Sequence, residues 1–312
     1  MKKILLLILS LVIAISFTTS AWSGKLTVML DWFPNPDHAP LVIAMQQGYF
    51  KEQGLDVDLK TPSDPSDPTN LVASREVDIA ITYEPEFIEL VDKGMPLMYL
   101  GSLIDKPLDC LVTLSGNGIK SPADLKGKRI GMIANGLGKA MLNVMLLQNG
   151  LSEKDVQIIN SDTNLSQALV NKKIDVAAGL MRNVEVPQLE LKGHHIAAFF
   201  PEEHGVPNYS LLIFVVNKAN AKDNRFPRFL TAIKKAVRYL DEHPRESWMM
   251  FIKQYPEANN EVNRESWFAT MPYFAENPAS FNQEEWQNFA EFMQKNNMIK
   301  KVQPLSRYTK IS

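Results

Sequence analysis

Short apolar runs with the length of β-strands alternate with helical segments along most of this 312-residue chain. In its first third, the expected strands are residues 25–30, 55–59, 77–82 and 96–103, and the expected helices are 41–48 and 84–93. Strands that alternate with helices pair in parallel, because each connection is a helix that covers the sheet. The pattern therefore predicts an α/β fold with parallel sheets.

A second α/β unit begins at Ser121-Pro122-Ala123-Asp124, where serine caps a helix, proline suits its first position and aspartate favours its positive end. Its expected strands are 129–133, 156–160 and 176–180, and its expected helices are 138–148, 165–171 and 186–192. Residues 211–216 form an apolar strand that crosses back. The tail from Phe226 onward is helical, with one apolar face made by Phe229, Ala232, Ile233, Ala236, Val237 and Leu240.

These assignments divide the chain into two lobes between which the backbone crosses twice. We expect lobe one to comprise residues 24–114 plus 216–312, and lobe two to comprise 115–215. Open α/β sheets bind ligands beyond the carboxyl ends of their strands, so the expected ligand site is a cleft between the lobes.

The N-terminus has the layout of a secretory signal peptide. A basic start, Met1-Lys2-Lys3, precedes a mainly apolar run over 4–17 and small residues over 18–21. The alternative is a membrane anchor, for which this run is short. We expect residues 1–23 to be removed, with cleavage after Ala21 or Ser23. Loss of two lysines changes the formal charge from −2 to −4. An exported chain of this kind is expected in a Gram-negative periplasm.

Composition excludes several classes of protein. The chain is 45% hydrophobic and 22% charged, which is typical of a globular protein rather than a disordered one. A formal charge of −2 provides no dominant basic field for nucleic acid. The single cysteine, Cys110, excludes an internal disulfide and a cysteine-rich metal site. Adjacent His194 and His195 point in different directions, and no nucleophile elbow is present. We expect no catalytic residue, no metal and no cofactor.

Two loops that follow strands carry the clearest ligand-binding candidates. Trp32, Asn35 and His38 follow the first strand, where an indole can stack on a flat ring and an amide offers both a donor and an acceptor. The alternative is a core tryptophan beside a simple Asn-Pro turn. Tyr83 and Glu84 follow a later strand, and they equally fit a helix start with favourable acidic charge.

Further candidates come from the second unit and the return crossing. Asn183 and Glu185 follow a strand and face the cleft from its opposite wall, whereas Arg182 is expected to be a solvated charge. Tyr209 precedes the return strand and fits either the cleft or an exposed loop. Gly136 and Gly138 join a strand to a helix, where free backbone N–H groups attract an oxyanion, although a tight turn explains them equally well.

Three segments together carry a family resemblance: residues 30–38 (LDWFPNPDH), 48–57 (GYFKEQGLDV) and 121–131 (SPADLKGKRIG). They resemble the periplasmic binding proteins of ABC importers that carry thiamine pyrimidine precursors. The second and third segments are shared with nitrate, sulfonate and taurine binders, whereas the first is more specific. The resemblance implies a two-lobed periplasmic-binding-protein fold of type II. It also implies hydroxymethylpyrimidine or formylaminopyrimidine as ligand and an inner-membrane ABC permease as partner. We expect a monomer.

In that interpretation Trp32 and Tyr83 provide flat apolar contact. The hydrogen bonds to the polar edges of the aminopyrimidine then come from four side chains, those of Asn35, Glu84, Asn183 and Glu185. Receptors for a sulfonate, nitrate or a flavin precursor are alternatives. An anion receptor should place Arg or Lys at the cleft, whereas these loops are richer in Asp, Glu and aromatic residues.

The resemblance extends to a fungal enzyme that makes the pyrimidine from pyridoxal phosphate and histidine. The position of its cofactor lysine corresponds to Thr82, and that of a histidine four residues later corresponds to Glu86. Its cysteine cluster corresponds to residues 207–210, which contain no cysteine. These departures argue against synthesis and leave the binding role intact.

Overall fold

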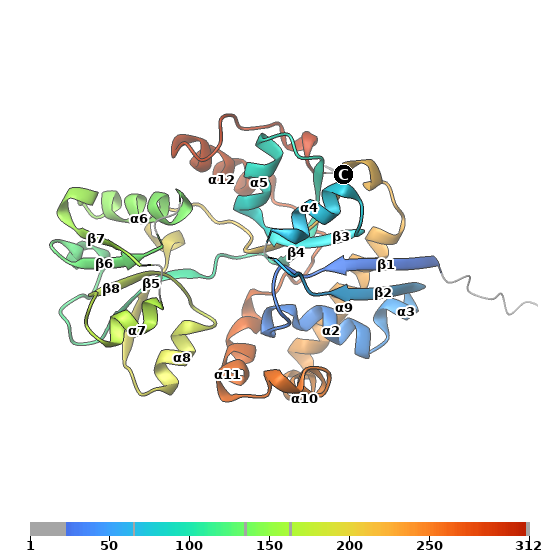
Figure 1. Ribbon diagram of the computed structural model, residues 1–312, viewed down its shortest axis with the longest axis horizontal. Coiled ribbons are helices and arrows are strands. Elements are labelled where there is room, and N and C mark those ends of the chain that lie inside the picture. Colours follow the sequence, from blue (N-terminus) through green and yellow to red (C-terminus); the bar gives the residue numbers. More distant parts are fainter. Residues whose placement is uncertain (1–22, 65, 134–135, 162–163, 310–312) are drawn as a thin grey trace, which may run out of the picture.

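The computed structural model describes residues 23–64, 66–133, 136–161 and 164–309. The expected signal peptide therefore lies, apart from Ser23, outside the described residues. Two five-stranded sheets form the centres of two separate lobes (Figure 1). Over the described ranges, the chain contains no helix with the length and apolar character that a membrane crossing requires.

The first lobe is built on a mixed sheet with the strand order β2-β1-β3-β10-β4. Its strands are β1 (Ser23–Met29), β2 (Leu55–Lys60), β3 (Ile79–Tyr83), β4 (Leu97–Ile104) and β10 (Leu212–Asn217). β1 pairs in parallel with β2 and β3, whereas β10 runs antiparallel to β3 and β4. Every residue of β10 is buried, as expected for a central strand that helices cover on both faces.

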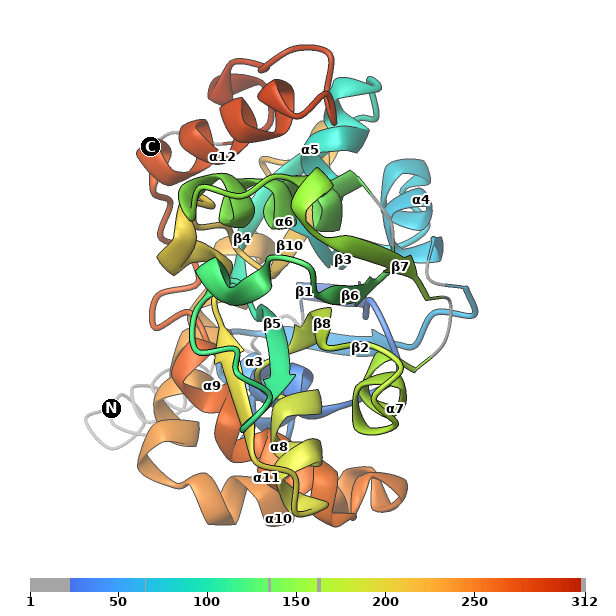
Figure 2. The same ribbon diagram turned by 90° about the vertical axis from the view of Figure 1, so that its left-hand side faces the viewer.

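Helices cover both faces of this sheet and extend toward the second lobe. They are α2 (Ala39–Gln46), α3 (Tyr49–Glu52), α4 (Asp67–Ser74), α5 (Glu84–Asp92), α9 (Arg225–Glu242), α10 (Pro244–Gln254), α11 (Glu261–Thr270) and α12 (Gln283–Lys295). The six apolar residues predicted on one face of α9 are all buried, and Phe229 packs on Phe50 and Phe214. In Figure 2, which faces the second lobe, α12 and α10 lie at opposite ends of the molecule.

The second lobe repeats the architecture on a smaller scale, with the strand order β7-β6-β8-β5-β9. Its elements are β5 (Asp109–Leu114), β6 (Arg129–Met132), α6 (Gly136–Gln148), β7 (Gln157–Asn160), α7 (Leu165–Val170), β8 (Val176–Met181), α8 (Glu185–Leu191) and β9 (Ile196–Phe199). The helix start predicted at Ser121 forms a short 3-10 turn, η2 (Pro122–Leu125). Ser121 and Asp124 close a capping box there.

The chain crosses between the lobes at residues 105–108 and 200–211. Both expected lobe boundaries differ from the structure. Residues up to 114 were expected in the first lobe, but β5 (109–114) belongs to the sheet of the second lobe. The first lobe was expected to resume at residue 216, but it resumes at Leu212, where β10 begins. β5 follows β4 after a short connection, so its local sequence resembles a continuation of the first sheet. Its antiparallel partners β8 and β9 decide its lobe, and they come much later in the chain.

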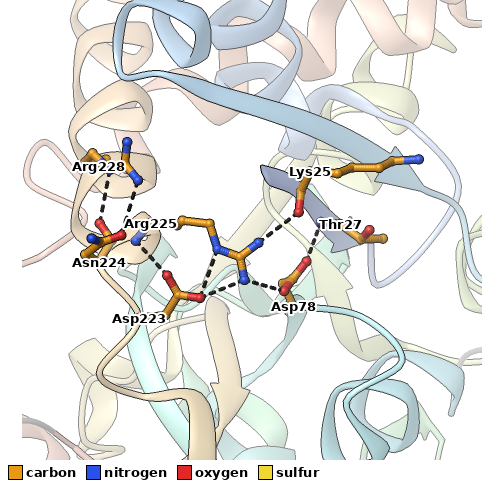
Figure 3. Close-up of polar contacts among 7 residues, drawn as sticks. All are labelled: Lys25, Thr27, Asp78, Asp223, Asn224, Arg225 and Arg228. Carbon is orange, nitrogen blue, oxygen red and sulfur yellow. Dashed lines mark hydrogen bonds and ion pairs between the residues drawn. The ribbon is translucent and has the colours of Figure 1, made fainter. Parts of the chain in front are cut away.

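A polar cluster holds the start of α9 against the first sheet (Figure 3). The Arg225 guanidinium binds Asp78 at 2.8 Å and Asp223 at 2.7 Å, and it donates to the Lys25 carbonyl at 2.8 Å. The second carboxylate oxygen of Asp78 accepts from the Thr27 backbone N–H at 2.8 Å. The cluster ties α9 to the amino-terminal ends of β1 and β3, which leaves the carboxyl ends of these strands for the cleft.

Candidate functional site

A cavity of about 400 Å³ lies between the lobes at the carboxyl end of β3. This volume is within the usual range for small-molecule sites. Its walls come from the β3–α5 junction (Tyr83, Pro85, Glu86 and Glu89), from the second lobe (Asp109, Gly136 and Leu137) and from the return crossing (Tyr209 and Leu211). We call it the cleft cavity. Of the residues with a predicted site role, Tyr83, Gly136 and Tyr209 meet here.

The cleft cavity is acidic. Its described lining includes the carboxyl groups of Glu86, Glu89 and Asp109 but no Lys or Arg. Burial raises the pKa of Glu86, although the Thr82 hydroxyl donates to its carboxylate at 2.7 Å and thereby opposes the shift. Burial likewise raises the pKa of Asp109, against a 2.6 Å hydrogen bond from the Tyr209 hydroxyl. Such a lining favours ligands that donate hydrogen bonds and opposes anions.

The loop that follows β1 is held to Tyr83 by a carboxylate that the sequence interpretation did not select. Asp31 binds the His38 ring nitrogen Nε2 at 2.8 Å and accepts from the Tyr83 hydroxyl at 3.0 Å. Burial opposes ionisation of Asp31, but the hydrogen bonds from His38 and Tyr83 and the charge of His38 outweigh it and lower its pKa. His38 is completely buried. It therefore lies at the base of the loop and not at the cleft rim, where it was expected.

The outer part of the same loop combines exposed aromatic rings with a self-contained turn. The Trp32 side chain is 48% exposed and packs edge-on against Phe33, with ring centroids 5.6 Å apart. It is not part of the cleft lining. Asn35 accepts from the Asp37 backbone N–H at 2.8 Å and donates to the Phe33 carbonyl at 3.0 Å. The Asn35 amide thus stabilises the turn, which is the alternative that the Asn-Pro sequence left open.

Glu84 points into the protein and not along the cleft. It is completely buried, and its Oε2 accepts from the Ser210 backbone N–H at 2.7 Å on the return crossing. Its Oε1 has no hydrogen-bond partner among the described residues. Burial raises the pKa of Glu84 to about 8. The predicted polar contact with a ligand is therefore replaced by a contact with the crossing segment, because the first turn of α5 directs this side chain inward.

Asn183 joins the two lobes. Its Nδ2 donates to Asp37 Oδ1 and to Thr270 Oγ1, both at 2.8 Å, and its backbone carbonyl accepts from the Ser266 hydroxyl at 2.6 Å. We call Asp37, Asn183, Ser266 and Thr270 the interlobe joint; all four are buried. Burial raises the pKa of Asp37 to about 6. The side chain expected to read a ligand is thus occupied in holding α11 and the β1 loop against the second lobe.

The neighbours of Asn183 are also engaged within the protein. Glu185 accepts from the Met181 backbone N–H at 2.9 Å and does not line the cleft cavity. The prediction that Arg182 is a solvated charge is wrong. It is largely buried, binds both carboxylate oxygens of Glu202 at 2.7 and 2.9 Å, and lies 3.9 Å above the Phe200 ring. No signal within the segment around Arg182 identifies these partners.

Tyr209 reaches the cleft from the return crossing. It is buried, stacks on Phe289 with ring centroids 4.8 Å apart, and donates to Asp109. Its partner Asp109, at the start of β5, carries no recognisable sequence signal and was not selected.

A second, smaller cavity of about 120 Å³ lies on the second-lobe side. It shares Asp109 and Leu137 with the cleft cavity, and Gly138, Met141 and Ala178 are among its other lining residues. We call it the annex. Gly136 begins α6 in the cleft wall, and Gly138 follows in the annex wall. Within the described residues, no group of three or more His, Cys, Asp or Glu side chains is arranged to hold a metal ion.

Relatives of the chain are named for thiamine and pyrimidine chemistry. A Haemophilus influenzae protein whose name refers to thiamine biosynthesis is 39% identical over 91% of each chain. The formylaminopyrimidine-binding protein of Halalkalibacterium halodurans is 32% identical over 81% of this chain and 80% of its own. A 4-amino-5-hydroxymethyl-2-methylpyrimidine phosphate synthase of Saccharomyces cerevisiae is 30% identical over 77% of this chain and 74% of its own.

The fold agrees with solved structures of periplasmic binding proteins. The periplasmic aliphatic sulphonate binding protein of Escherichia coli superposes with a TM-score of 0.70, over 91% of both chains at 15% identity. This confirms the predicted two-lobed fold. A family model described as NMT1/THI5 like matches residues 35–247, and the chain belongs to this family.

Proposed function

We propose that this chain is the substrate-binding component of an ABC importer and that its ligand is an aminopyrimidine precursor of thiamine. The observation that carries the proposal is the acidic, aromatic cleft cavity between the lobes, with Tyr83, Glu86 and Asp109 in its walls. The 32% identity to a formylaminopyrimidine-binding protein supports this class of ligand.

The lining suits a flat ring that carries an amine. The Tyr83 hydroxyl is engaged by Asp31, so the ring of Tyr83 is left as a flat surface for stacking. An exocyclic amine donates to a carboxyl oxygen of Glu86 or Asp109, which stand on opposite lobes and are both brought into the cavity. A sulfonate or nitrate would instead bring a negative charge beside Glu86, Glu89 and Asp109, and the described part of the lining has no Lys or Arg to pair with it.

The synthase alternative meets a lining that does not fit its cofactor. Pyridoxal phosphate needs a lysine amine, and the resemblance aligns that position with Thr82. Thr82 is buried, and its hydroxyl is hydrogen-bonded to Glu86. Residues 207–210 contain no cysteine. We therefore infer binding without turnover.

Location and partner follow from the same proposal. The basic, apolar and small-residue layout of residues 1–23 supports export to the periplasm. There a binding protein delivers its ligand to an inner-membrane permease. Mass-spectrometric sequencing of the protein from its native host should find an N-terminus near Trp22 or Gly24, and a retained Met1 would contradict the location.

Calorimetric titration of the mature chain tests the ligand. Hydroxymethylpyrimidine and formylaminopyrimidine should bind, whereas taurine and nitrate should not. Asp109→Asn should weaken binding of the aminopyrimidine at least tenfold. The ligand amine then lacks its carboxylate partner in a closed cleft, which reduces the binding free energy by about 1–3 kcal/mol. Asp56→Asn, on the exposed part of β2, is the matched control.

Two results would contradict the proposal. Binding of taurine or nitrate in preference to the aminopyrimidines would show an anion receptor. Formation of pyrimidine during incubation with pyridoxal phosphate and iron, dependent on this chain, would show a synthase.

A further inference from the structure

The annex extends the cleft into the second lobe beneath the start of α6. Leu137 and Asp109 belong to the walls of both cavities, so the annex begins where the cleft cavity ends. Met141 lines it from α6, and Leu111 and Ala178 line it from the paired strands β5 and β8. Leu111 and Ala178 lie toward the carboxyl end of β8. At that end of its strands, the second sheet faces the first lobe.

The chemistry of the annex is apolar. Apart from Asp109 at its entrance, the polar side chain in its described lining is Cys110, whose thiol donates to the Leu180 carbonyl at 3.1 Å. Apart from Asp109 and Cys110, the described side chains of the annex offer a water molecule none of the two to four polar partners that an ordered buried water needs. Displacing such a poorly held water with an apolar group strengthens binding.

The size of the annex limits what it can hold. An engineered apolar cavity of about 150 Å³ in another protein binds benzene. The annex measures about 120 Å³, so it suits a group smaller than a phenyl ring. A chain of one to three carbon atoms fits this limit.

We propose that the annex is a subsite for a short apolar substituent carried by the bound ring. The inference rests on the proposed function, because it needs an aromatic amine anchored in the cleft cavity. Asp109 stands at the junction and is held there by the Tyr209 hydroxyl at 2.6 Å. A ring whose amine pairs with Asp109 lies at the annex entrance, and the substituent at carbon 2, separated from the amine-bearing carbon by one ring nitrogen, extends from the same side of the ring into the annex. The site then selects its ligand by the substituent as well as by the amine.

Titration of the mature chain with a series of 4-aminopyrimidines tests the subsite. The series carries hydrogen, methyl, ethyl, propyl or phenyl at carbon 2 of the ring. Each added carbon should tighten binding about fourfold, the equivalent of about 0.8 kcal/mol for a buried CH₂, until the annex is full. The phenyl compound should bind more weakly than the propyl compound.

Two variants change the annex in opposite directions. Ala178→Val narrows it and should abolish the gain from methyl to propyl while binding of the unsubstituted ring remains. Met141→Ala enlarges it and should make the phenyl compound bind more tightly than the propyl compound. Ala198→Val on β9 makes the same change as the first variant in the same sheet but outside the lining, and it should leave the series unchanged.

The outcomes separate the two proposals. Equal affinity for the unsubstituted, methyl and ethyl compounds would overturn the subsite and leave the proposed function standing. The same holds if both annex variants keep the substituent preference of the parent. No binding by any member of the series would overturn the proposed function, and the subsite with it.

Discussion

Replacing Glu84 by glutamine should change how stability depends on pH. The Glu84 carboxyl is completely buried, with one oxygen bonded to the Ser210 backbone N–H and the other without a partner among the described residues. Burial raises its pKa from the ordinary 4.5 to about 8. The folded chain therefore retains a proton that the unfolded chain releases between pH 4.5 and 8.

The sign and size of the effect follow from proton linkage. Between these pH values the folded state binds more protons than the unfolded state, so the free energy of unfolding falls as pH rises. The slope is about 1.4 kcal/mol per pH unit, and it ends above the folded pKa. For a shift from 4.5 to about 8, the total loss is on the order of 5 kcal/mol. This is a large share of the typical stability of about 5–15 kcal/mol.

Urea unfolding of the parent and of Glu84→Gln at pH 5 to 9 measures the difference. At pH 5 the variant should be as stable as the parent or slightly less stable, since its amide brings a donor to a site that offers no acceptor. At pH 9 it should be more stable by several kcal/mol. Glu284→Gln, in the exposed first turn of α12, is the control and should give a constant difference. A constant difference for Glu84→Gln as well would refute the buried-carboxyl argument.

Further predictions concern the joint and the aromatic loop. Asn183→Ala should destabilise the chain by about 1–3 kcal/mol in urea unfolding, because it removes the shorter of the two buried hydrogen bonds to Asp37 and leaves the 3.3 Å one from Thr270, while the exposed Asn171→Ala should have little effect. Small-angle X-ray scattering of Asn183→Ala should also show a wider separation of the lobes, and an unchanged profile would contradict the role of the joint. Trp32→Ala should leave aminopyrimidine binding and Tm nearly unchanged, since the half-exposed ring does not line the cleft cavity. A loss of binding of tenfold or more in calorimetric titration of Trp32→Ala would show that this ring reaches the ligand.

Local sequence patterns predicted the elements of the fold better than its lobe boundaries. The apolar face of α9 follows from the spacing of its apolar residues along the helix. The helix start at Ser121 follows from a capping pattern within four residues. β5 lacks such a signal for its lobe, because its partners β8 and β9 are distant in sequence. The two-lobed fold was therefore predictable, but the position of the first crossing was not.

The site residues show the same limit more strongly. The sequence could place Asn183 and Glu84 at the carboxyl ends of strands, which is correct, but it could not show which way their side chains point. Asn183 turns toward Asp37 and Thr270, and Glu84 turns toward Ser210. Asp109 could not be selected, because its importance arises from Tyr209, a hundred residues later.

Carboxyl groups with raised pKa values stand where the lobes meet. Glu84 contacts the return crossing, Asp37 belongs to the interlobe joint, and Asp109 follows the first crossing. Burial is the main cause of the shift in each case. As these groups ionise, negative charge accumulates beside the cleft without a lysine or arginine in its described lining. An amine that enters the cleft cavity adds a second donor to the Asp109 side chain, beside the Tyr209 hydroxyl. Ligand binding therefore acts on carboxyl groups that stand at the contacts between the lobes.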